Sequence, residues 1–250
     1  MYVASSQNQA NQEEDPMRLP VAILAGGLAT RLHPLTEKIP KILLDINGRP
    51  FALCQIDLLR QNGFTDIVFC TGYLGEMVAE RLGDGRRYGV NIRYVSDWPN
   101  LLGTGGALLK AVPFLGKAFF VIYGDSYMPC EYALVEDAFL KSGKSGMMTV
   151  FHNMNLWDQS NVLYRDGKII LYDKQSNDPA MQHIDYGVGV LRSDVLAHYP
   201  SGVPLDLATV YQDLIVHDQL AAFEVTQRFY EIGSPAGLEE TRNYLSNLEA

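Results

Sequence analysis

Short apolar runs alternate with stretches of helical periodicity through the first half of this 250-residue chain, and no other feature restricts its fold as strongly. A short apolar run suits a buried strand, whereas apolar positions that repeat every three or four residues suit a helix with one buried face. The patterns predict strands at residues 21–24, 66–70, 91–95 and 118–122, and helices at residues 51–62, 74–82 and 105–111. This alternation is typical of an α/β fold with a mostly parallel sheet.

The second half of the chain, after residue 130, has a pattern that is richer in strands. We predict strands at residues 146–151, 161–164, 168–172, 183–191, 221–225 and 228–232, and helices at residues 207–219 and from about residue 235. Because no long linker or repeat divides the chain, we expect a single domain over residues 18–250. Residues 1–17 are polar, have little to bury, and are expected to form a disordered extension.

The composition argues against several classes of protein. The net charge of −9 disfavours a nucleic-acid partner, which would require a basic face. No run approaches the roughly 20 apolar residues of a membrane span, and the N-terminus lacks a basic and then apolar signal. No P-loop pattern, GxxxxGK followed by Ser or Thr, occurs. We therefore expect a cytoplasmic protein that binds neither nucleic acid nor membrane and is not a P-loop kinase.

Two adjacent glycines, Gly26 and Gly27, follow the first predicted strand directly. Glycine lets the backbone turn tightly and approach a ligand without interference from a Cβ atom. Thr30 and Arg31 then supply a hydroxyl and a planar guanidinium group, and Lys41 follows a proline-bounded loop. Two cations beside one glycine turn predict a site for a phosphate group or a base.

The segment LAGGLATRLHPLTEKIPK, residues 24–41, resembles the signature GGxGTRLxPLTxxxPK of the sugar-phosphate nucleotidyltransferases. The similarity runs from about residue 19 to the C-terminus and is strongest with short bacterial members such as the heptose 1-phosphate guanylyltransferases. Ala29 stands where the family's third glycine is usual, so we expect that position to avoid a positive φ angle. The resemblance implies a Rossmann-like, three-layer, GT-A-like fold and a nucleotide site that includes Leu24, Ala25, Gly26, Gly27 and Thr30.

The same resemblance implies an enzyme of nucleotide-sugar and polysaccharide biosynthesis, with the nucleotide bound at about residues 18–130 and the sugar phosphate at about residues 131–250. It joins an NTP and a sugar 1-phosphate to give an NDP-sugar and pyrophosphate. GTP with a heptose or hexose 1-phosphate is our first choice, and UTP or CTP stays open. A homo-oligomer is compatible with this interpretation.

Two carboxylates are candidate ligands for Mg²⁺ or Mn²⁺. Asp125 directly follows a predicted strand, and ligands of open parallel sheets bind beyond the carboxyl ends of the strands. The family holds its metal at this Gly-Asp position. The segment YEIGSP resembles the family's D-x-G-[ST]-P, which makes Glu231 the second candidate, although the family has aspartate there. Carboxylates from two strands suit Mg²⁺, which takes its remaining ligands from water and substrate phosphates.

A second glycine-rich stretch, residues 102–107, resembles the family's GTAGA-like element. The resemblance places Gly103, Thr104 and Gly105 against the nucleobase, at a helix N-terminus that faces the ligand. Asp97 lies shortly before this stretch, and an acid on the surface is the first interpretation. The alternative is a base-reading role, in which its carboxylate would accept hydrogen bonds from two guanine donors.

On the acceptor side, the resemblance assigns the sugar phosphate to Asn161, Asp173, Lys174, Asp185 and Gly187. Lys174 corresponds to the lysine of the family's Glu-Lys pair and would neutralise the sugar's phosphate. Asp185 precedes Gly187 in a segment like the family's (N/D)-x-G and would accept a sugar hydroxyl.

The resemblance assigns catalytic roles to Arg31, Lys41, Asp125 and Lys174. Arg31 would hold the leaving end of the triphosphate, Lys41 the reacting phosphates, and Lys174 the attacking phosphate. Because a phosphate nucleophile is already anionic, positioning and charge neutralisation carry such a transfer. Two other classes stay open: a catalytically weak nucleotide-sugar-binding regulator on the same fold, and a GT-A glycosyltransferase, although the D-x-D motif typical of that class does not occur around Asp125.

Overall fold

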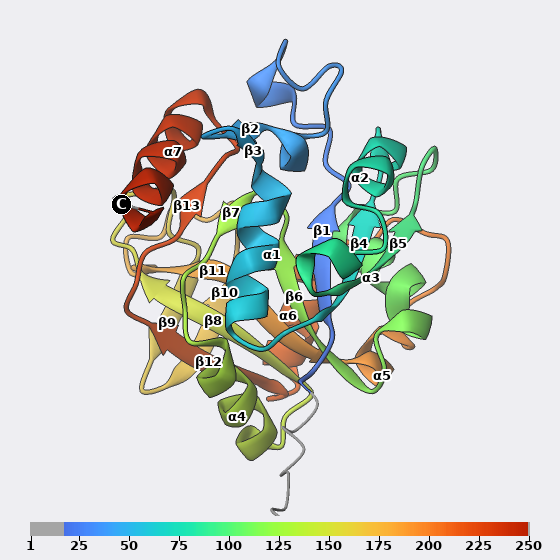
Figure 1. Cartoon of the computed structure of the whole chain (residues 1–250). Coiled ribbons are helices and arrows are strands. Elements are labelled where there is room, and N and C mark those ends of the chain that lie inside the picture. The colour runs from blue at the N-terminus through green and yellow to red at the C-terminus, as the bar shows by residue number, and fades with distance from the viewer. Residues whose placement is uncertain (1–17, 250) are drawn as a thin grey trace, which may run out of the picture.

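The first half of the chain forms parallel strands joined by helices, as the periodicity predicts (Figure 1). The computed structural model describes residues 18–249, so the predicted extension at residues 1–17 lies outside the described residues. The elements are β1 (Val21–Ala25), α1 (Phe51–Gln61), β4 (Asp66–Thr71), α2 (Gly75–Leu82), β5 (Asn91–Ser96), α3 (Gly103–Ala111) and β6 (Ala118–Tyr123). β1 pairs in parallel with both β4 and β6, and β4 pairs in parallel with β5.

The second half extends the same sheet, mainly through antiparallel pairing. Its elements are α4 (Tyr132–Ser142), β8 (Gly146–His152), β9 (Val162–Arg165), β10 (Lys168–Tyr172), β11 (His183–Arg192), α5 (Ser193–Leu196), α6 (Leu207–Val216), β12 (Leu220–Val225) and α7 (Pro235–Glu249). β11 joins the halves because it pairs antiparallel with β6. The resulting nine-stranded sheet has the order β10-β9-β11-β6-β1-β4-β5, and β8 pairs with both β11 and β12.

Both faces of the sheet are buried, which makes the fold three-layered. Along β1, Val21 and Ile23 pack into the cluster that includes α1, α2, α4 and α7, whereas Ala22 packs into the cluster that includes α3, α5 and α6. Successive strand residues point to opposite faces, so an apolar run without alternation requires cover on both sides. The predicted α/β fold class is confirmed. Within residues 18–249, no helix has the length and hydropathy that crossing a bilayer requires.

Two predictions for the second half were wrong in detail. The segment after residue 130 begins with a helix, α4, whose buried Tyr132, Val135 and Phe139 follow helical spacing. The predicted strand at residues 228–232 is reduced to β13 (Tyr230–Glu231), which pairs with the short β7 (Ser126–Tyr127) outside the main sheet. A second short ladder joins β2 (Asp45–Ile46) and β3 (Arg49–Pro50).

Candidate active site

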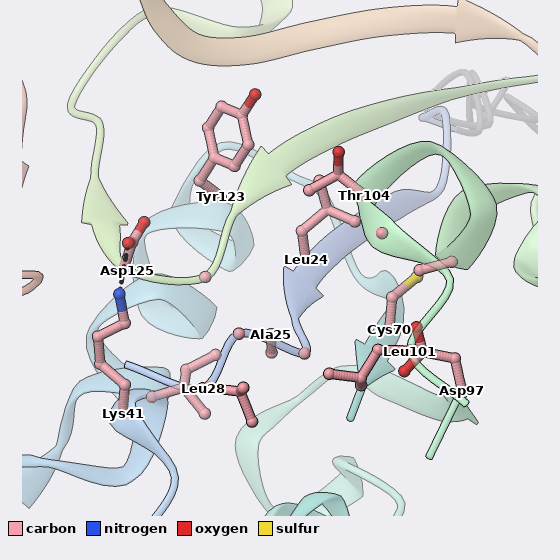
Figure 2. Close-up of a pocket in the computed structure, with 16 residues that line it drawn as sticks. Leu24, Ala25, Leu28, Lys41, Cys70, Asp97, Leu101, Thr104, Tyr123 and Asp125 are labelled. Atoms are coloured by element: carbon pink, nitrogen blue, oxygen red, sulfur yellow. Dashed lines mark hydrogen bonds and ion pairs between the residues drawn. The ribbon is translucent and has the colours of Figure 1, made fainter. Parts of the chain in front are cut away.

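A pocket of about 320 Å³ lies beyond the carboxyl ends of β1, β4, β5 and β6 (Figure 2). β1 connects forward to β4 on one side, whereas its neighbour on the other side, β6, comes later in the chain. Strand order therefore reverses between β1 and β6, and open parallel sheets bind ligands at such a point. Leu24 and Ala25 of β1 line the pocket together with Tyr123 and Gly124 at the end of β6.

The two glycines after β1 have different structural tasks. A Cβ atom built on Gly26 would lie 3.3 Å from the backbone nitrogen of Gly72, which follows β4. A Cβ atom on Gly27 would meet nothing within 4 Å. Gly26 therefore allows two strand ends to approach one another, and Gly27 leaves room at the mouth of the pocket, which both glycines line.

Ala29 does not avoid a positive φ angle, so that prediction was wrong. The residue is left-handed, with φ 50° and ψ 40°. Its carbonyl oxygen accepts hydrogen bonds from the Leu32 amide at 3.1 Å and from the hydroxyl of buried Thr36 at 2.8 Å. These bonds, which close the turn at the start of the Thr30–Leu32 3₁₀ helix, hold a conformation that costs alanine about 1–2 kcal/mol.

Lys41 and Asp125 form an ion pair at one end of the pocket (Figure 2). Lys41 Nζ lies 2.6 Å from Asp125 Oδ2, and the hydroxyl of Ser126 donates to Asp125 Oδ1 at 3.2 Å. Lys41 begins the 3₁₀ helix Lys41–Leu43, directly after Pro40. The candidate phosphate-binding cation and the candidate metal-binding carboxylate are thus direct partners.

Glu231 lies beside this pair, but its carboxylate bonds within its own segment. The backbone amide of Ile232 donates to the Asp125 carbonyl at 2.8 Å, which holds the two segments together. The Glu231 carboxylate accepts hydrogen bonds from the Gly233 amide and, at 2.6 Å, from the hydroxyl of Ser234, just before α7. The longer side chain of glutamate can thus reach the start of this helix.

Gly233 marks a small space shared by three charged groups. A Cβ atom built there would lie 2.5 Å from Glu231 Oε2, 3.4 Å from Arg31 Nη2 and 3.7 Å from Asp125 Oδ2. Arg31 itself is exposed and does not line the pocket. No group of three or more His, Cys, Asp or Glu side chains suited to a metal ion occurs within residues 18–249. A cation at this point would therefore need further ligands from substrate or water.

The N-terminus of α3 is partly covered by the segment around Leu205. The amides of Gly105 and Gly106 donate to the Leu205 carbonyl at 2.8 and 3.2 Å. A Cβ atom on Gly103 would lie 2.7 Å from the same oxygen. The second glycine-rich stretch thus lets the segment before α6 pack closely against it. Gly103 and Thr104 nevertheless line the pocket.

Asp97 lies at the other end of the pocket, with Cys70 and Leu101 (Figure 2). The Leu102 amide donates to Asp97 Oδ2 at 2.8 Å, whereas Asp97 Oδ1 is buried without a hydrogen-bond partner. A buried acceptor without a donor costs about 1–3 kcal/mol. Burial, with a smaller contribution from Asp97, raises the pKa of the Cys70 thiol to about 12, so this end carries a neutral thiol.

Asp185 is the centre of the acceptor-side residues. Its Oδ2 accepts hydrogen bonds from the hydroxyls of Tyr172 at 3.0 Å and Tyr123 at 3.5 Å, and its Oδ1 accepts from the Gly187 amide at 3.0 Å. Burial raises the pKa of Asp185, and the charge of Lys174 opposes that rise. Because Tyr123 lines the pocket, it connects the nucleotide side to the acceptor side.

Asp206, which we did not select from the sequence, forms a second link between the two halves of the chain, in addition to the one through Tyr123. Its carboxylate caps α6 through the Ala208 amide, accepts from the Thr104 hydroxyl at 3.2 Å and lies 3.6 Å from Lys174 Nζ. An aspartate immediately before a predicted helix is a usual capping signal, so the cap could have been found from the sequence. Its partners, Thr104 on α3 and Lys174 after β10, could not be found from the sequence.

The remaining predicted residues mainly shape the backbone. Asn161 Oδ1 accepts from the Asp185 amide at 2.9 Å, and Asp173 Oδ1 accepts from the Gln175 amide at 2.8 Å. Gly187 has φ 96°, and a Cβ atom there would lie 2.9 Å from the sulfur of Met128. Of the predicted nucleotide-binding residues, all except Thr30 and Gly105 line the pocket.

Comparisons with known proteins agree with this geometry. A family model described as nucleotidyl transferase matches residues 21–156, more than half of the chain. The N-acetylmuramate alpha-1-phosphate uridylyltransferase of Neisseria meningitidis serogroup B is 30% identical over 227 residues, 88% of this chain and 95% of that protein. The chain belongs to the nucleotidyl transferase family. The predicted family and the predicted enzyme class, a nucleotidyltransferase, are confirmed.

Two further matches show the breadth of the family. The mannose-1-phosphate guanyltransferase of Schizosaccharomyces pombe is 31% identical over 237 residues, 90% of this chain, and the chain spans only 64% of that protein's length. The crystal structure of HddC from Yersinia pseudotuberculosis complexed with GMP-PN matches with a TM-score of 0.74 and 22% identity, over 91% of this chain and 100% of that one. Nucleotidyl transferases with different bases in their names thus share this chain's sequence or fold.

Proposed function

We propose that this chain transfers a nucleotidyl group from an NTP to a sugar 1-phosphate, giving an NDP-sugar and pyrophosphate for nucleotide-sugar and polysaccharide biosynthesis. The observation that carries the proposal is the pocket itself: signature residues line it at the strand-order reversal, and Tyr123 joins it to the Asp185 and Lys174 side. An oxygen of the sugar phosphate attacks the α-phosphorus, the bond from that phosphorus to the β-phosphate's bridging oxygen breaks, and pyrophosphate leaves with the electron pair.

The proposed roles follow from where the charged side chains lie. Lys41 neutralises the reacting phosphates beside Gly26 and Gly27, and Arg31 holds the leaving end of the triphosphate from outside the pocket. Lys174 binds the attacking phosphate, with its position supported by Asp206 at 3.6 Å. Because both phosphates are anionic, cations beside them lower the barrier by bringing the reacting atoms together and neutralising developing charge.

The residues around Asp125 fit a divalent ion such as Mg²⁺ or Mn²⁺. The ammonium group of Lys41 already occupies a cation's place 2.6 Å from Asp125 Oδ2, and the absence of a side chain at Gly233 leaves space between Asp125 and Glu231. Asp125 and Glu231 would hold the ion, with phosphate oxygens and water as the other ligands. Bound there, it would supply charge neutralisation at the phosphates.

For the base, we propose GTP as the substrate. The unpartnered Asp97 Oδ1 would gain a donor from guanine, which offers two adjacent N–H groups where the imide edge of uracil offers one. The guanyltransferase name of the S. pombe relative agrees with this choice. UTP is the second candidate, because the Neisseria relative, of which the chain covers 95%, is named a uridylyltransferase.

A substrate matrix tests the proposal. GTP, UTP, CTP and ATP are each combined with mannose, glucose, heptose and N-acetylmuramate 1-phosphates in the presence of Mg²⁺, and released pyrophosphate is measured. We expect release only when an NTP and a sugar 1-phosphate are both present, with one base preferred. Pyrophosphate release that does not depend on the sugar phosphate would contradict the proposal. So would the absence of pyrophosphate release with every pair of NTP and sugar 1-phosphate.

A further inference from the structure

The ion pair between Lys41 and Asp125 joins two groups to which the proposed function gives different partners. In the proposed function, Lys41 binds the phosphates of the nucleotide and Asp125 binds a divalent cation. Lys41 Nζ nevertheless lies 2.6 Å from Asp125 Oδ2, and the exposed fractions of the two side chains are only 17% and 32%. Because partial burial reduces screening by water, each group strongly affects what the other can bind.

We propose that Lys41 is a stand-in cation that occupies Asp125 until the nucleotide arrives, so that the site excludes a free divalent ion. This inference rests on the proposed function. A metal ion cannot take Asp125 Oδ2 while the ammonium group is within hydrogen-bond distance, since the two cations repel one another. Lys41 leaves Asp125 when the triphosphate offers it a replacement anion, and the carboxylate then becomes available to a divalent ion that enters with the nucleotide.

At Asp125 the exchange needs movement of the Lys41 side chain, while Arg31 Nη2 and the hydrogen-bonded Glu231 carboxylate lie beside the same space. The backbone of Lys41 is fixed, because Pro40 precedes it and the Leu44 amide donates to its carbonyl at 3.0 Å. The four-carbon side chain can move its ammonium group between two anions, which a fixed guanidinium fork would do less readily. Lys41 lines the same pocket as Gly26 and Gly27, so phosphates held at the glycine turn would lie within its reach.

The Ser126 hydroxyl keeps Asp125 in place during the exchange. It donates to Asp125 Oδ1 at 3.2 Å, and the Asp125 carbonyl accepts from the Ile232 amide at 2.8 Å. Only Oδ2 therefore changes its partner. Among residues 18–249 no cluster of three or more candidate ligand side chains supports a free ion, so the loss of Oδ2 to Lys41 removes a main attraction for the bare metal.

Binding of Mn²⁺ alone, without nucleotide, tests the inference. Free Mn²⁺ is measured by electron paramagnetic resonance during titration of the wild type, Lys41→Met, Lys38→Met and the double variant Lys41→Met/Asp125→Asn. Lys41→Met removes the charge and keeps most of the side chain's length, and we expect it to bind Mn²⁺ about tenfold more tightly than the wild type, equivalent to about 1.4 kcal/mol. Lys38 is exposed in the same loop, so Lys38→Met changes the net charge equally and should match the wild type.

The variants separate failure of this inference from failure of the proposed function. If Lys41→Met binds Mn²⁺ no more tightly than the wild type but the double variant loses binding, the stand-in role of Lys41 is wrong and the metal assignment survives. If the double variant binds Mn²⁺ as well as Lys41→Met does, Asp125 is not the ligand. The stand-in role of Lys41 and the metal assignment are then both wrong. Equal tightening by Lys38→Met would reduce the effect to net charge and overturn the inference. Unfolding temperatures confirm that each variant is folded.

Discussion

At the scale of single residues, the charged groups of the site form hydrogen bonds or ion pairs with other groups of the protein. Lys41 binds Asp125, Glu231 binds the start of α7, and Asp97 binds the Leu102 amide. The sequence identifies these residues as candidates, but it does not reveal which partner each of them takes in the folded protein. Substitutions at this scale therefore affect stability and ligand binding together.

Asp185→Asn should stabilise the protein at neutral pH. Burial raises the pKa of Asp185 above its ordinary 3.8, so the folded state favours the protonated form. Below that ordinary value both folded and unfolded states are protonated and no stability is lost. As the pH rises from there to the raised folded value, ionisation favours the unfolded state. We expect the variant to melt above the wild type at pH 7, with a smaller gain near pH 4. An equal gain at both pH values would contradict this account.

Glu231→Asp should lower the stability of the protein as well as the dependence of turnover on metal. Aspartate is one methylene shorter and cannot keep both the hydrogen bond to Ser234 and the position next to Asp125. We expect a loss of about 1 kcal/mol in urea unfolding, the usual size of a lost hydrogen bond, and weaker dependence of turnover on Mg²⁺. If stability and metal dependence both stay at the wild-type level, Glu231 is only a carboxylate at the rim.

At the scale of elements, the strands were easier to predict than the contacts between helix ends. The predicted ranges match β1, β4, β5 and β6 within one residue. For β1, β4 and β6 the reason is that a strand buried on both faces needs a continuous apolar sequence, whereas the edge strand β5 has exposed ends and buries Ile92 and Val95. The glycine-rich start of α3 was assigned to the ligand, whereas the segment at Leu205 occupies much of it. Its partner lies about a hundred residues away in the chain, and no local pattern encodes such a contact.

Gly103→Ala should show that this contact is close. Gly103 has φ 72°, and an added Cβ would lie 2.7 Å from the Leu205 carbonyl oxygen. Gly116 is a matched control, since it has φ 66° and an added Cβ would meet nothing within 4 Å. Both variants pay the left-handed cost of about 1–2 kcal/mol, and we expect Gly103→Ala to lose at least about 1 kcal/mol more in urea unfolding. Equal losses would mean that the α3 and α6 segments separate easily.

At the scale of the whole molecule, one sheet brings together the pocket at the strand-order reversal and the cluster around Asp185, which we propose for the nucleotide and the sugar phosphate. The parallel half and its pocket at the strand-order reversal follow from general rules for α/β folds. The resemblance selects Lys174 and Asp185, but the ion pair of Lys174 with Asp206 could not be predicted, because these two residues come from separate segments, after β10 and before α6. The proposed choice of base likewise rests on one buried carboxylate, Asp97, whose Oδ1 atom lacks a hydrogen-bond partner.

Nucleotide titration in thermal-shift measurements tests that choice. With Mg²⁺ present, GTP at about a hundred times its Kd should stabilise the protein by about 2.7 kcal/mol, a rise of about 5–10 °C in Tm, and the other NTPs should raise it less. Asp97→Asn should remove the preference, because an amide mismatches one of the two guanine donors. Stabilisation by UTP or CTP but not GTP would overturn the choice of base and leave the enzyme class intact.

The most direct test of the proposed reaction follows the α-phosphorus by ³¹P nuclear magnetic resonance, with the NTP and sugar 1-phosphate pair that the substrate matrix selects. We predict that the α-phosphorus becomes part of a new diphosphate bridge to the sugar phosphate, while free pyrophosphate appears in equal amount. Asp125→Asn should form neither product at a measurable rate. Appearance of a nucleoside diphosphate with inorganic phosphate, or loss of the sugar phosphate without a new diphosphate bridge, would contradict the proposed nucleotidyl transfer.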